Sequence, residues 1–99
     1  MDRDPALLAD EGAEVEDAAP LVAEARAGGA ELSYAVKAEA EVRLEVFDLL
    51  GRRRAVLESG AKAAGRYRAR WEASGRAGIY FARLTVGRER YVQRFALVP

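Results

Sequence analysis

The chain has 99 residues, a length that suits one compact domain. It contains neither histidine nor cysteine, so it lacks the side chains on which catalysis near neutral pH and transition-metal binding most often depend. The composition therefore predicts a protein that is not an enzyme and uses no cofactor or metal ion.

The formal net charge is zero, but acidic and basic residues are divided unevenly along the chain. Residues 1–20 contain seven acidic residues and one arginine, a net charge of −6, whereas residues 21–99 contain nine acidic and fifteen basic residues, a net charge of +6. The acidic segment has almost no aromatic or β-branched residues, so it buries too little apolar surface to offset the entropy of ordering. We predict that residues 1–20 form a disordered linker or arm. The alternative is a short helix over residues 5–9 with Asp4 as its N-cap.

From residue 21 onward the hydrophobic pattern has a period of two, and glycine-bearing turns recur about every ten residues, as expected of a sandwich or barrel. The first and fourth strands are expected at sheet edges, and the last two strands are expected to form a hairpin. The seven predicted strands cover residues 21–26, 31–37, 41–49, 54–58, 66–73 and 79–86, and a final run with Tyr91, Gln93, Phe95 and Leu97 on one face. Glycines 28 and 29 are expected to close the first strand, and Ser59, Gly60 and Gly65 to mark the loop after the fourth.

Strands with one dry and one wet face need a second sheet to cover the dry face. The pattern therefore predicts an all-β, immunoglobulin-like antiparallel sandwich of about seven strands over residues 21–99. A small closed barrel is the alternative. Phe47 falls on the outer face of its strand. The predicted core is Leu32, Tyr34, Val42, Leu44, Val46, Tyr67, Trp71, Tyr80, Leu84 and Phe95.

The charged residues of this part of the chain suggest no reaction centre. Glu39, Glu41 and Glu45 are the best available set of carboxylates. Glu41 and Glu45 are expected on a solvated face, where nothing would shift a pKa. The many arginines are interpreted as a solvated face rather than a nucleic-acid site, because no groove of stacking aromatic residues accompanies them.

Four blocks in residues 41–98 resemble a known family. They are VFDLLGR at 46–52, AGRYRARW at 64–71, GIYFARL at 78–84 and RFALV at 94–98. Together they resemble the C-terminal sorting domains of the bacterial type IX secretion system and the related immunoglobulin-like domain of the flagellar hook-capping protein. The proline- and asparagine-rich opening of that family is replaced here by EARAGG at 24–29, and the chain ends in Pro99 rather than a basic residue.

Each block also has a structural interpretation that does not depend on the family. Asp48 and Gly51 should bracket a tight turn, and Trp71 should anchor the core. Tyr80 is a candidate corner tyrosine whose hydroxyl holds a loop. The signature residues, all given structural roles, are Asp48, Gly51, Gly65, Trp71, Gly78, Tyr80 and Leu84.

The resemblance implies a non-catalytic C-terminal module of an exported bacterial protein that sorts its cargo for secretion and anchors it at the cell surface. The alternative is a structural domain of a hook-cap-like or adhesive surface assembly. The expected partners are export machinery or assembly subunits, with an N-terminal cargo domain in the parent chain, no nucleic acid and no direct membrane insertion. The expected location is the cell surface or the medium, reached through the periplasm by a signal that precedes this sequence. Arg94, Ala96 and Val98 form the candidate recognition strand.

Overall fold

The computed structural model describes residues 20–26, 28–73 and 76–98. The predicted acidic arm and its helical alternative therefore lie, apart from Pro20, outside the described residues. None of the described residues forms a helix long and apolar enough to cross a membrane. The described elements are the strands β1 (Leu21–Arg26), β2 (Gly29–Val36), β3 (Ala40–Asp48), β4 (Arg53–Lys62), β5 (Gly65–Glu72), β6 (Gly78–Val86) and β7 (Glu89–Leu97).

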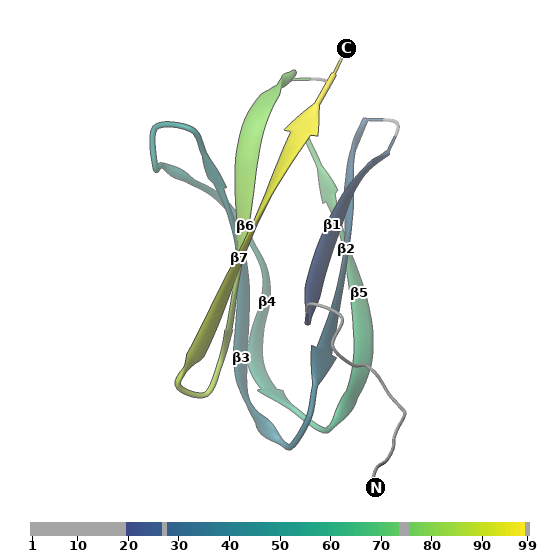
Figure 1. The fold of residues 1–99 in the computed structure, drawn as a ribbon, viewed down its shortest axis with the longest axis vertical. Helices are drawn as coiled ribbons and strands as arrows, with labels where there is room; N and C mark the ends of the chain where they lie inside the picture. Colours follow the sequence, from purple (N-terminus) through teal and green to yellow (C-terminus); the bar gives the residue numbers. More distant parts are fainter. Residues whose placement is uncertain (1–19, 27, 74–75, 99) are drawn as a thin grey trace, which may run out of the picture.

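The seven strands form two antiparallel sheets that pack as a sandwich (Figure 1). One sheet has the order β1-β2-β5, and the other has the order β4-β3-β6-β7. The prediction of a seven-stranded immunoglobulin-like sandwich is confirmed, and the barrel alternative is wrong because the two sheets remain separate. The expected edge positions of β1 and β4 and the β6–β7 hairpin are also confirmed.

The core lies between the sheets and is built from the inward residues of alternating positions. Of the ten predicted core residues, Tyr67 is partly buried against the core and the others are buried. Trp71 of β5 meets Tyr80 of β6 and Phe95 of β7 edge to face, with ring centroids 4.8 and 6.1 Å apart. This aromatic cluster joins the two sheets near one end of the sandwich, where β5 and β7 finish and β6 begins.

Two stretches differ from the prediction. Strand β4 does not end at Glu58 but continues to Lys62, and Gly60, with a φ of 135°, pairs with Val42 inside the strand. The reason is that the β3–β4 ladder shifts register twice, which breaks the regular alternation on which the prediction depended.

Gly29 was expected in the turn that closes the first strand, but it is the first residue of β2. It pairs with Glu72 within the β2–β5 ladder. A β-carbon at this position would collide with the carbonyl oxygen of Trp71, so the close approach of the two strands requires glycine here.

We predict that replacing Trp71 by alanine lowers the free energy of unfolding by about 3 to 5 kcal/mol, because it removes the buried indole that both sheets contact. Urea denaturation followed by far-ultraviolet circular dichroism measures this loss. Leu50→Ala is the control, since Leu50 is exposed in the β3–β4 turn. A Trp71 variant as stable as the Leu50 variant would contradict the assigned core.

Candidate functional site

The candidate site is the outer face of the four-stranded sheet, which carries several arginines. Inward residues of β3, such as Val42, Leu44 and Val46, are buried in the core, so their neighbours along the strand point outward. Cross-strand pairing then places outward residues from all four strands in three rows. These rows, which we call the arginine face, are Ser59–Arg43–Thr85–Arg90, Val56–Glu45–Arg83–Val92 and Arg53–Phe47–Phe81–Arg94.

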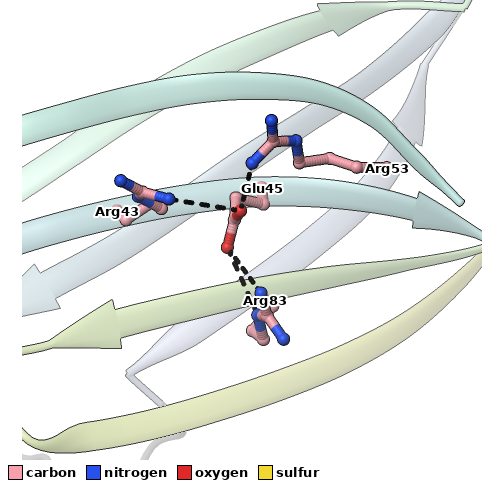
Figure 2. A network of polar contacts seen from close by, with 4 residues as sticks. All are labelled: Arg43, Glu45, Arg53 and Arg83. Atoms are coloured by element: carbon pink, nitrogen blue, oxygen red, sulfur yellow. Dashed lines mark hydrogen bonds and ion pairs between the residues drawn. The ribbon is translucent and has the colours of Figure 1, made fainter. Parts of the chain in front are cut away.

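Glu45 lies at the centre of this face and is held by three arginines (Figure 2). Arg83 donates from Nη2 to Oε1 over 3.0 Å, and Arg53 donates from Nη1 to Oε2 over 3.2 Å. Arg43 Nη1 lies 3.9 Å from Oε2. The Glu45 side chain is only 2% exposed, although it is on the outer face. The side chains around it on this face, rather than the apolar core, cover the carboxylate.

The arginines change the acidity of this carboxyl group. Burial by itself raises the pKa of Glu45, but hydrogen bonds from Arg83 and Arg53 and the charges of Arg83 and Arg43 together outweigh that effect. The pKa of Glu45 is therefore held below its ordinary value. The expectation that Glu45 is solvated with nothing to shift its pKa is wrong. Glu41, on the same strand, is exposed as expected.

The sequence could not reveal the Glu45 network because Arg53 and Arg83, the two arginines that donate to Glu45, lie on other strands. Alternation within β3 predicts which way Glu45 points, but not which side chains of the neighbouring strands cover it. Arg83 is 38 positions away and lies opposite Glu45 only because of the β3–β6 register. The one local signal was Arg43, two positions before Glu45 on the same predicted outer face.

The arginine face is strongly basic as a whole. Its five arginines and single glutamate have a net charge of +4. Arg43 and Arg53 remain 54% and 52% exposed despite their contacts with Glu45. Arg90 and Arg94 are exposed and make no ion pair with another described residue. The face therefore offers guanidinium donors to an anionic partner.

Aromatic and apolar side chains lie among the arginines. Phe47 is on the outer face, as predicted, and its strand β3 is central in the sheet. The guanidinium carbon of Arg83 lies 4.6 Å from the centroid of the Phe47 ring, in cation–π contact. Arginine and aromatic residues together are the types enriched in protein interfaces.

The candidate recognition strand, β7, alternates between two environments. Phe95 and Leu97 are buried, whereas Arg94, Ala96 and Val98 are exposed, Val98 by 81%. Arg94 is part of the arginine face. Ala96 pairs with Ile79 farther along the strand, and Val98 follows the end of β7. The structure thus separates the proposed recognition residues from the core.

The signature residues form no single site but occupy separate structural positions. Asp48 Oδ1 accepts hydrogen bonds from the backbone N–H groups of Leu50 and Arg52, at 3.0 and 2.9 Å, and Gly51 has a φ of 83°. The backbone N–H of Arg52, together with its guanidinium, holds the pKa of Asp48 below its ordinary value, although desolvation opposes this shift. The turn interpretation of Asp48 and Gly51 is confirmed.

The other signature residues support strands or the core. Gly65 and Gly78 begin β5 and β6, and Trp71 and Leu84 are buried. The hydroxyl of Tyr80 donates to the carbonyl oxygen of Arg76, at 3.3 Å, in the segment before β6. Tyr80 therefore holds that segment, as expected of a corner tyrosine.

The fold defines the protein as a small all-β domain of two sheets. A scan of protein-family models finds no match to the chain, and a search among curated proteins also finds none. In the part of the chain that the structure describes, no three acidic side chains group closely enough to hold a metal ion.

We predict that Glu45→Gln destabilises the protein by about 1 to 3 kcal/mol at pH 7, because three arginines lose their shared carboxylate. A carboxyl group whose pKa is lowered by folding stabilises the protein above its ordinary pKa, and this stabilisation is lost as the pH falls through the folded-state pKa. The difference between the wild type and the variant should therefore shrink in acid. Urea denaturation at neutral pH and at a pH below the ordinary carboxyl range measures it.

Glu41→Gln is the matched control for this experiment. Glu41 lies on the same strand but is exposed, so its substitution should change stability little at either pH. An equal loss from Glu45→Gln at both pH values would show that the side chain acts through packing rather than charge.

Proposed function

We propose that this domain is the non-catalytic C-terminal module of an exported bacterial protein and acts in secretion sorting and surface anchoring. The observation that carries the proposal is the terminal hairpin, where β7 combines an edge position with a row of exposed residues. The family resemblance supports it, because its four blocks fall on the β3–β4 turn and on β5, β6 and β7. The module acts by being bound, and its partners are proteins.

The edge position of β7 suits recognition by another polypeptide. A strand at the edge of a sheet has backbone groups available for an added strand, and alternate side chains can provide specificity. In the last part of β7 the exposed members are Arg94 and Ala96, with Val98 just beyond the strand. Their substitution leaves Phe95 and Leu97 in the core, so recognition can be altered without removing the residues that stabilise the fold.

In this proposal the partner is the export machinery, which recognises the folded domain after its transfer to the periplasm. The cargo precedes the domain in the parent chain, and the final location is the cell surface or the medium. The proposal involves no cofactor, no nucleic acid and no insertion of the domain into a membrane.

The second candidate is a structural domain of a hook-cap-like or adhesive surface assembly. The observation that favours it is that both sheets are open, with β1 and β5 at the edges of one and β4 and β7 at the edges of the other. Several open edges allow contacts with more than one neighbouring subunit.

We predict that the domain, fused behind an export signal and a reporter, carries the reporter to the cell surface or medium of a host with the type IX machinery. The double variant Arg94→Glu, Val98→Glu should leave the reporter in the periplasm, because it reverses one charge and adds another on the exposed row. Fractionation and immunoblotting of the reporter measure the outcome. Removing residues 94–99 is a poorer test, since it also deletes the buried Phe95 and Leu97.

The matched control is Arg66→Glu, Val22→Glu, which makes the same chemical changes on the outer face of the other sheet. This control should be exported like the unmodified domain. Retention of the unmodified fusion in the periplasm, while a family member with the proline-rich opening is exported in parallel, would reject the sorting function and favour the assembly domain.

A further inference from the structure

We propose that the arginine face binds the acidic N-terminal segment of the same chain, residues 1–19. The inference depends on the charges and positions of residues in this domain and does not require the proposed export function. The segment lies outside the described residues, and the argument uses its sequence and its point of attachment.

The first step is charge complementarity. The arginine face has a net charge of +4, and residues 1–19 contain seven carboxylates and one arginine, a net charge of −6. The single acidic residue on the face, Glu45, cannot balance five guanidinium groups. An acidic peptide supplies the missing counter-charges, because charge complementarity both guides and orients association.

The second step is the preorganisation of the face. Glu45 holds the guanidinium groups of Arg53 and Arg83 (Figure 2). Arg83 also packs on Phe47, so these side chains lose less freedom when a ligand binds. A guanidinium group has five N–H donors. Glu45 accepts one from Arg53 and two from Arg83, which leaves donors on both groups for further carboxylates.

The third step concerns apolar contacts on either side of the Glu45–Arg83 pair. Val56 and Val92 occupy the ends of this row and are 45% and 60% exposed. The acidic segment contains Leu7, Leu8 and Val15 among its carboxylates. The face and the segment therefore match in apolar as well as charged residues.

The fourth step is position. The segment joins the fold at the start of β1, and β1 contacts β7, the strand that bears Arg90 and Arg94 (Figure 1). Nineteen residues in extended form span up to about 60 Å, whereas the fold measures 46 × 25 × 19 Å. The attachment raises the effective concentration of the segment at this face.

The outer face of the β1-β2-β5 sheet is a poorer binding surface for an acidic segment. There, three of the four arginines of β1 and β5 are already close to carboxylates of the folded domain, and Arg66 is the exception. Arg26 and Arg68 lie 3.8 and 3.9 Å from Glu31, and Arg70 pairs with Glu72. A nucleic acid is also a poorer occupant of the arginine face than a peptide, since Arg83 covers the Phe47 ring that a base would stack on.

The test uses the full chain with Arg90→Lys, which keeps the positive charge and gives the face a primary amine. A carbodiimide that couples amines to nearby carboxylates, followed by peptide mass spectrometry, should join position 90 to acidic residues within 1–19. Arg66→Lys is the matched control, because Arg66 is also exposed on an outer face and makes no ion pair with another described residue. We expect the yield of cross-links to residues 1–19 to be about tenfold higher from position 90 than from position 66, and to decrease at high salt because salt screens the attraction between the charges.

Mixing isotope-labelled and unlabelled chains before coupling identifies the source of the segment. Cross-links within one isotopic form support the proposal. Cross-links between the two forms would assign the face to a second copy, and equal yields at positions 90 and 66 would also overturn the proposal. Failure of coupling together with binding of a single-stranded oligonucleotide to the unmodified chain would assign the face to nucleic acid instead. None of these outcomes depends on the export experiment.

Discussion

The alternation of residues along β3 is the constraint on which the rest of the structure depends. This strand lies between β4 and β6, so it has no free edge and its register is fixed on both sides. Its inward residues, Val42, Leu44 and Val46, pack in the core, and its outward residues build the arginine face. A slip of one residue would exchange the two sets, because side chains alternate with a period of two. The core and the candidate site are thus two results of one register.

The Glu45 network contributes to the specificity of that register. A buried ion pair is weak evidence for net stability, since the cost of removing charges from water offsets much of their attraction. The free-energy cost of burying Glu45 away from its arginines is larger than this net contribution. In a register shifted by one residue, Glu45 would point into the core without its arginines, and an unpaired buried charge is among the most unfavourable features in a fold. The network therefore favours the native pairing over its nearest alternative, while it also positions the guanidinium groups of Arg53 and Arg83.

Sequence patterns predicted those features that depend on neighbours along the chain. The bounds of β1, the β6–β7 hairpin and the turn at Asp48 follow from alternation, turn residues and local hydrogen bonding. The full length of β4, the role of Gly29 and the burial of Glu45 were not predicted. Each depends on a strand distant in sequence: the register shifts opposite β3, the carbonyl oxygen of Trp71 and the guanidinium of Arg83. Periodicity indicates which face a residue occupies, but tertiary pairing decides what covers it.

Arg94 connects the two proposed interactions. It is part of the arginine face through its pairing with Phe81, and it is also the first residue of the candidate recognition strand, which continues through Ala96 to Val98. An acidic segment bound on that face therefore reaches the beginning of the candidate recognition strand. Two ligands that use the same guanidinium compete for it, and by linkage each weakens the binding of the other. The two proposals together thus imply that the acidic segment and an external partner oppose each other at β7. Because an exposed ion pair weakens as salt rises, the external partner gains in this competition at higher ionic strength if its own contacts are mainly backbone and apolar.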